Sequence, residues 1–503
     1  MSIPPFTDHS EGQPDPASPV DNPPRARKRV ALIGGGVALA LAVGAGAVAF
    51  TTLSSKGAQP DTVMPGEVAL YARIDLDPSA GQKVNTVRFL SKLPKSKGDL
   101  AKDPRQALFS MIKDGSSGLK DIDYAKDVEP WLGDRLAVGV LPGAAGAEPV
   151  AVVAVQVKDE AKAKDGIARL MKSGDGTAEV TMKDGYALIS EKGTSAAAVT
   201  ASLAKGSLAT NKTYLEDMAA LGDPGIASLW ADTTPLLQAI PSDLLSTTGG
   251  KAPAGTTPDV LKDTGRVAAA WRFDADYVEV AGIVRGAKAP KVAPKAGLAS
   301  MTSLPDSTVG AVQVSGAGEG AVSVWEQVRS ALDSSGIASE DLGTQLGLTL
   351  PADLLTLLGS SLTVAVPEQD FGSDLPTVGL KVDSPDATKA ASLIEGMFAS
   401  AGSTPLPMSV QGSTYYLSTT ESYLDALKSG GTLGSTPAFA AAVPNADTAT
   451  AAMYVDLDKI EKTYRDDLSA DLKDMVLAMR SVGISGSQDG KGNGTFTMRV
   501  VSN

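Results

Sequence analysis

The stretch WLGDRLAVGVLP at residues 131–142 has an altered second copy, LLGSSLTVAVPE, at residues 357–368. In both, a Leu-Gly pair precedes apolar residues at alternate positions, which predicts a strand with one buried face. Further blocks match in the same order: 64–69 with 304–309, 153–164 with 378–389, 205–218 with 430–443, 227–232 with 451–456, and 267–280 with 482–495. Because chance similarity of composition does not preserve order, these matches predict an internal duplication.

The matched blocks fall into two stretches, and we expect one repeat at residues 62–286 and a second at residues 302–503. The Pro, Lys and Ala-rich segment 287–301 is typical of an extended linker between them. Strand-like runs joined by tight turns at 273–277 and 488–494 predict hairpins, and helical patterns lie between the strands. The predicted fold class is therefore α+β, an internally duplicated unit of mainly antiparallel sheet with packed helices.

Three pairs of residues are expected in like positions: at a strand-to-helix turn, inside a capped helix, and in the last hairpin. They are, in that order, Asp232 with Asp456, Tyr214 with Phe439, and Asp274 with Asp489. We also expect helix starts at Ser384-Pro385 and at Thr436-Pro437. The apolar spacing over residues 463–480 predicts a long amphipathic helix.

The N-terminal region differs from the rest of the chain. Residues 1–29 contain seven prolines and few apolar residues, which predicts a disordered tail. Residues 30–53 carry no charge, and a helix of that length, at about 1.5 Å per residue, crosses the roughly 30 Å of a bilayer core. The bases at 25–29 predict a cytoplasmic tail and an outer C-terminal body, with the lipid bilayer as partner of residues 30–53. The alternative is a cleaved signal peptide, with a cleavage site at 47–49.

Composition excludes several kinds of chemistry. The chain has no cysteine, and its one histidine, His9, lies in the tail. A thiol nucleophile, a cysteine-bound zinc, and a Ser-His-Asp triad are therefore excluded from the body. The net charge of −13 argues against a nucleic-acid partner, and no phosphate-binding glycine loop follows a strand. We expect no cofactor.

Paired acids are the remaining candidates for catalysis. Asp75 and Asp77 follow one apolar strand, and Asp456 and Asp458 follow another, so either pair could supply the two carboxylates of a glycosidase. We interpret these acids instead as residues that cap helices or tighten turns. A calcium loop is a further alternative at the first pair, although Ala80 stands where such a loop requires glycine.

Two further sets of residues resemble known functional patterns. Ser202 and Lys205, with the Lys-Ser-Gly triplet 428–430, resemble motifs of cell-wall serine acyltransferases, but the expected Ser-x-Asn element between them is missing. The four tryptophans lie in apolar runs, which favours core positions over sugar-stacking platforms: Trp131, Trp230, Trp271 and Trp325. The sequence therefore assigns no catalytic, cofactor-binding or metal-binding residue.

The phrases MPGEVALYARIDLDPS (64–79) and VEPWLGDRLAVGVLP (128–142) follow a basic tail and one apolar span. With these features, residues 60–503 resemble an uncharacterised actinobacterial family of membrane-anchored proteins, labelled domain of unknown function 3352. The resemblance implies an anchored envelope protein. It supplies no reaction, ligand or catalytic residue.

We therefore expect a single-pass, membrane-anchored extracytoplasmic protein with a non-catalytic binding or scaffolding role at the cell envelope. One alternative is a carboxylate-dependent hydrolase acting on wall or glycan material. Another is a carrier of an apolar ligand, because curved antiparallel sheets crossed by helices can enclose lipid. The expected partners are envelope proteins or an apolar ligand.

Overall fold

The computed structural model describes residues 57–93, 105–106, 109–110, 113, 122–143, 149–173, 178–239, 265–288, 296–335, 338–370, 375–465, 473 and 476–503. The predicted tail, 1–29, and the predicted membrane span, 30–53, lie outside these residues. We call residues 57–288 the first half and residues 296–503 the second half.

The described strands form one sixteen-stranded sheet in which every paired neighbour is antiparallel. The first half contributes β1 (Leu70–Asp75), β2 (Leu132–Leu141), β3 (Val150–Val157), β4 (Ala178–Lys183), β5 (Tyr186–Glu191), β6 (Ala227–Asp232), β7 (Arg266–Phe273) and β8 (Tyr277–Arg285). The second half contributes β9 (Thr308–Ser315), β10 (Ser361–Pro367), β11 (Gly379–Asp383), β12 (Met408–Gln411), β13 (Thr414–Ser418), β14 (Ala451–Asp456), β15 (Met479–Gln488) and β16 (Gly494–Ser502). The predicted α+β class with antiparallel sheet is confirmed.

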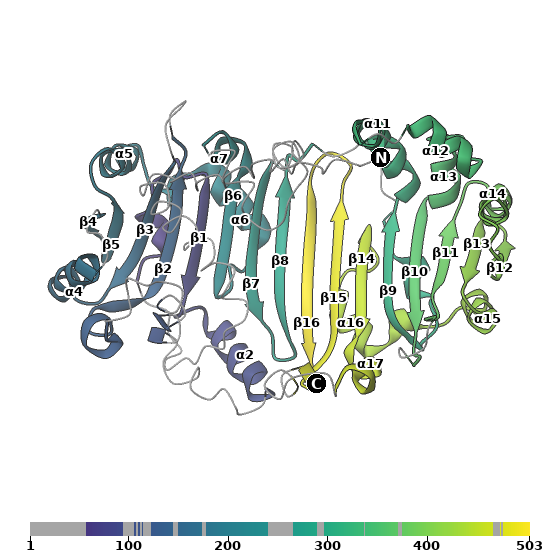
Figure 1. Ribbon diagram of the computed structural model, residues 1–503. Helices are drawn as coiled ribbons and strands as arrows, with labels where there is room; N and C mark the ends of the chain where they lie inside the picture. The colour runs from purple at the N-terminus through teal and green to yellow at the C-terminus, as the bar shows by residue number, and fades with distance from the viewer. Residues whose placement is uncertain are drawn as a thin grey trace, which may run out of the picture.

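The two halves meet at the centre of the sheet, where β8 pairs with β16 (Figure 1). Outward from this joint, the first half runs β7, β6, β1, β2, β3, β5, β4, and the second half runs β15, β14, β9, β10, β11, β13, β12. Taken in chain order, the eight strands of each half therefore occupy the same places. The halves share one continuous sheet and are not separate bodies.

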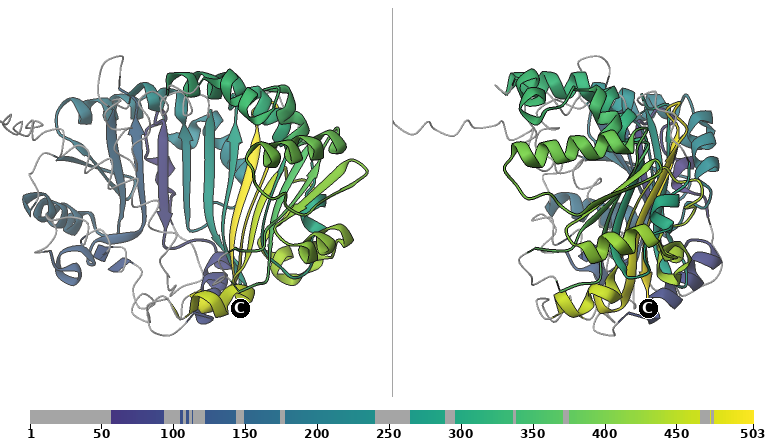
Figure 2. Two further views of the ribbon diagram at one scale, coloured as in Figure 1. Left: turned by 45° about the vertical axis from the view of Figure 1, so that its right-hand side comes forward. Right: turned by 90° about the vertical axis from the view of Figure 1, so that its right-hand side faces the viewer.

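Helices lie on both sides of this sheet, as its end-on view shows (Figure 2). Those of the first half are η2 (Pro60–Thr62), α2 (Ala80–Ser91), η5 (Tyr124–Val128), α4 (Glu160–Ser173), α5 (Thr194–Leu203), η6 (Leu208–Thr210), α6 (Lys212–Leu221) and α7 (Thr233–Ala239). Those of the second half are α10 (Ala299–Thr302), α11 (Ala317–Ser334), α12 (Ser339–Leu346), α13 (Ala352–Leu358), α14 (Ala387–Ser400), α15 (Glu421–Ser429), η7 (Leu433–Ser435), α16 (Pro437–Ala442) and α17 (Leu457–Tyr464).

The pairs predicted to lie in like positions do so. Asp232 ends β6 directly before α7, and Asp456 ends β14 directly before α17. In both last hairpins, between β7 and β8 and between β15 and β16, an aspartate carboxylate accepts a hydrogen bond from the N–H two residues on. Asp274 accepts from Asp276 at 3.3 Å, and Asp489 from Lys491 at 2.7 Å. This is the bonding of an Asx turn.

Tyr214 and Phe439 also occupy matching places. Each is the third residue of its helix, and its N–H donates to the side chain of the N-cap residue, Asn211 or Thr436. Each ring meets a strand aromatic edge-on: Tyr214 meets Trp230 with centroids 5.7 Å apart, and Phe439 meets Tyr454 at 5.1 Å. The buried pattern of the two helices is the same.

Three predictions need correction. The helix expected over 463–480 is wrong at its C-terminal end, because β15 begins at Met479; residues 463–464, 473 and 476–477 are helical, and 466–472 and 474–475 lie outside the described residues. Helix α14 is capped by Asp386 rather than started by Ser384-Pro385, since the Asp386 carboxylate accepts the N–H of Lys389 at 2.9 Å. The extended linker 287–301 stops before its predicted end, because Leu298 and the Met301 of α10 are buried in the second half's core.

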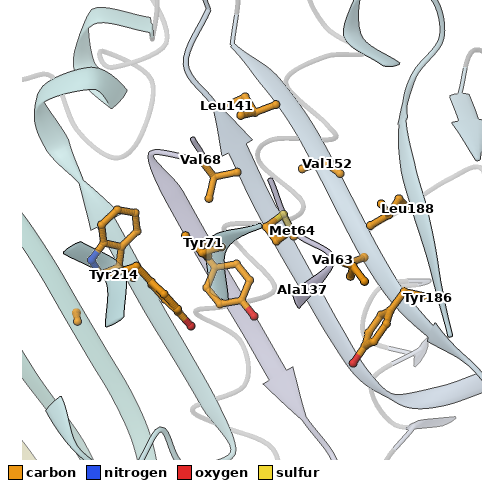
Figure 3. Close-up of a cluster of buried hydrophobic side chains, with 14 of the residues drawn as sticks. Val63, Met64, Val68, Tyr71, Ala137, Leu141, Val152, Tyr186, Leu188 and Tyr214 are labelled. Carbon is orange, nitrogen blue, oxygen red and sulfur yellow. The ribbon is translucent and has the colours of Figure 1, made fainter. Parts of the chain in front are cut away.

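Each half has its own core on one side of the sheet. The first-half cluster contains Tyr71, Tyr186, Tyr214 and Trp230, several of which Figure 3 shows around Met64. The second-half cluster contains Ala311, Ala365, Phe439 and Tyr454 under α10, α15 and α16. We call this side of the sheet the core side, and the other side the outer side.

Candidate functional site

The predicted carboxylate pair at the end of β1 lies in a buried ion-pair cluster. Asp75 is 3% exposed, and its Oδ2 accepts from Arg135 Nε at 3.1 Å and from Arg73 Nη1 at 3.4 Å. Asp77 pairs with Lys83 and also lies 3.8 Å from Arg135 Nη2. The two carboxylates thus share one guanidinium, which neutralises them and leaves no free acid-base pair here.

Electrostatics support this arrangement. Burial by itself lowers the pKa of Arg135, but the neighbouring carboxylates, Asp75 foremost, raise that pKa above its ordinary value. The turn role predicted for Asp75 is confirmed, since its Oδ1 accepts the N–H of Asp77 at 2.9 Å. The prediction missed the arginines, although both alternate in sequence with apolar strand residues, a sign of charges aimed at the core.

The cluster holds the first residues of the described chain. Arg135 Nη1 donates to the Gly57 carbonyl at 3.2 Å, and the Tyr186 hydroxyl donates to the Ala58 carbonyl at 2.6 Å. The Gln59 side chain bonds Arg73 and donates to Asp75 at 3.2 Å. The arrangement fixes the point where the chain enters the fold.

The second predicted pair is a helix cap. Asp456 Oδ1 accepts the Lys459 N–H at 3.2 Å at the start of α17, and its Oδ2 accepts the buried Tyr454 hydroxyl at 3.0 Å. Asp458 accepts from Asn503 at 3.1 Å. The capping interpretation of Asp456 is therefore confirmed.

The acyltransferase-like motifs lie far apart. Ser202 is on α5, which packs on β3 and β5, whereas Lys428 is on α15, which packs on β11 and β13. These strands belong to opposite ends of the sheet. Lys205 pairs instead with Glu67 at 2.9 Å, and Lys428 with Asp425 at 2.8 Å. No joint site forms from these residues.

The tryptophans are core residues. Trp131, Trp230 and Trp325 are 4%, 3% and 9% exposed, and Trp271 packs half-buried against the cluster around Phe273. Among the described residues, no group of three or more acidic or histidine side chains is placed to hold a metal ion. These residues therefore form no sugar-stacking platform and no metal centre.

The feature that sequence reasoning missed is an uncovered apolar surface on the outer side of the second half. Register pairs align five residues of five adjacent strands in one line: Val364, Val312, Met453, Ile484 and Met498, of β10, β9, β14, β15 and β16. Their exposures are 37%, 43%, 43%, 41% and 39%. We call these five residues the exposed row. Figure 1 shows β15 and β16 with no helix drawn across them.

The neighbours of the exposed row are apolar as well. Val314 is 39% exposed, and the next line along the strands contains Val366, Val455, Val482 and Val500, all apolar. An antiparallel sheet normally turns polar side chains to its solvated face, so this surface departs from the usual alternation. The exposed row, the line through Val366 and the line through Val314 together span five strands. They cover about 24 by 20 Å, roughly 500 Å² of sheet, which is near the upper end for the largest apolar patch of a monomer.

Covered clusters bound the exposed row at both ends. Beyond β10, Leu380 of β11 packs with Leu357 and Leu362 in a cluster that includes α14. Beyond β16 the line continues through Val280 to Trp271, which packs against the cluster of Phe89 and Phe273. The result is an open apolar stretch of limited length.

Fold and site together define a class: an α+β protein built on one long antiparallel sheet, with its buried acids held in ion pairs and one apolar sheet surface uncovered. The chain belongs to the family described as "Protein of unknown function (DUF3352)", whose model matches residues 32–404. The resemblance read from the sequence is thereby confirmed at the level of the family.

Similarity to other proteins is weak. No curated protein matches the chain. The solved structure titled "Structure of crystal form I of TP0453" is 8% identical, covers 46% of this chain and 80% of its own, and has a TM-score of 0.22. Crystal form III of the same protein is 9% identical, covers 47% and 82%, and has a TM-score of 0.23. Within the described residues, no helix combines the length and apolarity needed to cross a bilayer.

Proposed function

We propose that this protein is a non-catalytic binding protein of the cell envelope, and that its ligand is apolar and lies on the open outer surface of the second half. The observation that carries the proposal is the exposed row, with its uncharged neighbours on five adjacent strands. Water contact with so much apolar surface is unfavourable by about 25 cal/mol per Å², and a bound apolar group removes it.

Hydrolytic and purely scaffolding functions receive less support. A carboxylate-dependent hydrolase loses its nearest candidates, because Asp75 and Asp77 share Arg135 and Asp456 caps a helix. A scaffolding role does not require an uncovered apolar surface. A carrier of an apolar ligand does.

A small apolar probe tests this function. The full chain, reconstituted in phosphatidylcholine vesicles, is treated with a neutral alkyl diazirine, photolysed and mapped by mass spectrometry. We expect labelling concentrated at Met453, Ile484 and Met498, and its loss in Ile484→Lys. The control is Leu215→Lys, which changes a 45% exposed leucine on α6 of the first half. Labelling spread evenly over exposed apolar side chains would reject the site.

The proposal includes an anchored position outside the membrane. Its support is the uncharged stretch 30–53 preceded by the bases at 25–29. Protease added to intact spheroplasts should digest the body and spare the tail. A protected body would contradict this location, and a mature chain that begins near residue 50 would favour the cleaved signal peptide.

We also propose that the body arose by internal duplication. Support comes from the matching strand order of the halves and from the matching positions of Asp232 with Asp456 and of Tyr214 with Phe439. The pairing of β8 with β16 at the centre of the sheet adds a further argument. Ala281 of β8 and Thr497 of β16 occupy equivalent positions in the two halves, and they pair with each other. The register pairs on one side of this pair are equivalent to those on its other side. A two-fold axis through this pair would exchange the halves.

A further inference from the structure

We infer that the open outer surface of the second half binds the extended acyl chain of a membrane lipid, lying across the strands along the exposed row. The inference rests on the proposed function and names its ligand class.

The dimensions suit one long chain. From Val364 on β10 to Met498 on β16 the exposed row crosses four inter-strand gaps, and Val280 on β8 adds a fifth. At about 4.8 Å per gap, the line measures roughly 19 to 24 Å. The acyl chains of one leaflet occupy about half of the ~30 Å hydrocarbon core, so the row accommodates a chain of membrane length.

The side chains suit an alkyl ligand. Every position of the exposed row is aliphatic or a thioether, and its neighbours Val314, Val455 and Val482 are aliphatic too. Met453 and Met498 supply flexible, polarizable groups that adapt to an irregular methylene chain. No aromatic or charged side chain belongs to the row to select a flat or ionic ligand.

Helices beside the surface favour a narrow ligand over a second sheet. Leu362 and Leu380, which point to the outer side, pack in one cluster with Ile394 and Met397 of α14. Helix α14 therefore lies on the outer side of the sheet, packed on β12 and β13 beyond the β10 end of the row (Figure 2). A helix is about 10 Å across, and two stacked sheets must approach to about 10 Å. A second sheet stacked over β10 to β13 would meet α14, whereas a single chain lying along the row would not.

The membrane is the nearest source of such chains. Only residues 54–56 separate the uncharged stretch 30–53 from Gly57, whose carbonyl is held by Arg135 at 3.2 Å. Four residue steps of at most about 3.6 Å span roughly 14 Å, so in an anchored chain Gly57 stays within that distance of the bilayer. The buried ion-pair cluster thus tethers the first half of the sheet near the lipid that supplies the ligand.

The test uses the full chain in phosphatidylcholine vesicles that contain a trace of phosphatidylcholine with a diazirine at the end of one acyl chain. After photolysis we expect lipid adducts at residues of the exposed row. Met453→Lys combined with Ile484→Lys should reduce these adducts at least tenfold, and Leu215→Lys should leave them unchanged. Circular dichroism should show the same thermal transition for all variants, and Ile484→Thr serves as a milder variant.

A second measurement needs no variant. In displacement of the diazirine lipid by free saturated fatty acids, affinity should rise about fourfold per added methylene and level off once the chain fills the row. Affinity independent of chain length, or cross-links that join two protein copies through the row, would overturn the inference. If the small diazirine reagent labels the row and the lipid does not, the acyl inference fails and the proposed function stands. If neither labels it, both fail.

Discussion

The two halves of the sheet place the same strands in the same order but fill them with different chemistry. The register of strand pairing identifies the equivalent residues of the two halves. Tyr71 of β1 lies opposite Gly139 and Trp230, and Ala311 of β9 lies opposite Ala365 and Tyr454. Counting along the strands from these points, the equivalent core-side residues are Arg73 and Gln313, Asp75 and Ser315, and Arg135 and Ser361.

The first half therefore buries charges where the second half buries neutral polar groups. Gln313 donates to Ser361 at 3.2 Å and to the Gly297 carbonyl at 3.5 Å, and it accepts the N–H of Met301 at 2.7 Å. Arg135 makes the corresponding bond to Gly57. Arg135 and Gln313 thus each bond the carbonyl of a glycine with positive φ, Gly57 or Gly297, before the first strand of its half. Only the charged cluster around Arg135 depends on every charge having a partner.

The outer side shows the opposite contrast. At the places of Val312 and Ile484, the first half carries Ala72 and Ala269, both 5% exposed. At these equivalent positions the second half is thus neutral on the core side and apolar on the outer side, whereas the first half is charged on the core side and buries small residues on the outer side. The same strand order therefore carries a buried ion-pair cluster in the first half and an uncovered apolar surface in the second half.

The largest expected effect is the difference in stability cost between asparagine substitutions of Asp75 and of Asp456, each at the end of a strand. Asp75→Asn takes the bonded anion from the buried Arg73 and leaves Arg135 with Asp77, 3.8 Å away, so we expect a loss of about 3 kcal/mol in the free energy of unfolding. Asp456→Asn should cost less than about 1 kcal/mol, because Asn also caps a helix and the pair that it loses, with Lys459 3.5 Å away, is partly exposed. Chemical denaturation of the purified protein measures both. Equal costs would remove the distinction between the halves.

Exchanging the equivalent aromatics is expected to have a smaller and unequal effect. Phe439→Tyr adds a hydroxyl at a 1% exposed position, which should cost about 1–3 kcal/mol if the hydroxyl stays without a partner. Tyr214→Phe removes only the bond to Asp61, 3.3 Å long, and should cost about 0.5–1.5 kcal/mol. Denaturation midpoints of the two variants give the ranking, and the reverse order would contradict it.

The equivalent outer-side residues Ala269 and Ile484 are expected to differ in how well they tolerate replacement by threonine. Ala269→Thr enlarges a 5% exposed side chain and should lower stability by about 1–3 kcal/mol through overpacking. Ile484→Thr changes a 41% exposed side chain and should stay within about 0.5 kcal/mol of the wild type. A large loss at Ile484 would mean that the row contributes to the folded core.

The smallest expected effect is a pair of opposite pH dependences. Burial raises the pKa of Asp61 above 3.8, so its stabilising contribution is present below that value and is lost as pH rises through the raised pKa. Bonds from Lys389 and from the Thr349 N–H lower the pKa of Asp353, so its contribution is present above 3.8 and is lost as pH falls through the lowered pKa.

Thermal midpoints between pH 3 and 6 read out both groups. Relative to the wild type, Asp61→Asn should gain stability as pH rises, and Asp353→Asn should lose it. Parallel curves for the two variants would contradict the assigned signs.

Local patterns predicted much of the fold. Residues 131–142, whose alternating apolar positions predict a strand, contain β2. Thr436-Pro437 starts α16 as predicted, because a hydroxyl cap and a proline at the first helical position act within one turn. The helix predicted over 463–480 failed at Met479, since pairing with β14 and β16, remote in the chain, fixes the residues from Met479 as a strand.

Composition and local patterning were enough to predict the α+β class, the antiparallel hairpins, the family resemblance and the lack of thiol and histidine chemistry in the body. These follow from composition and from periods shorter than a dozen residues. The folded arrangement of the strands was needed to show that Arg135 binds Asp75, 60 positions away, and that Met453, Ile484 and Met498 lie in one exposed line. The physical reason is that ion pairing and solvent exposure depend on which strands become neighbours. Long-range register sets those neighbours, and a single strand's alternation does not say which of its faces remains uncovered.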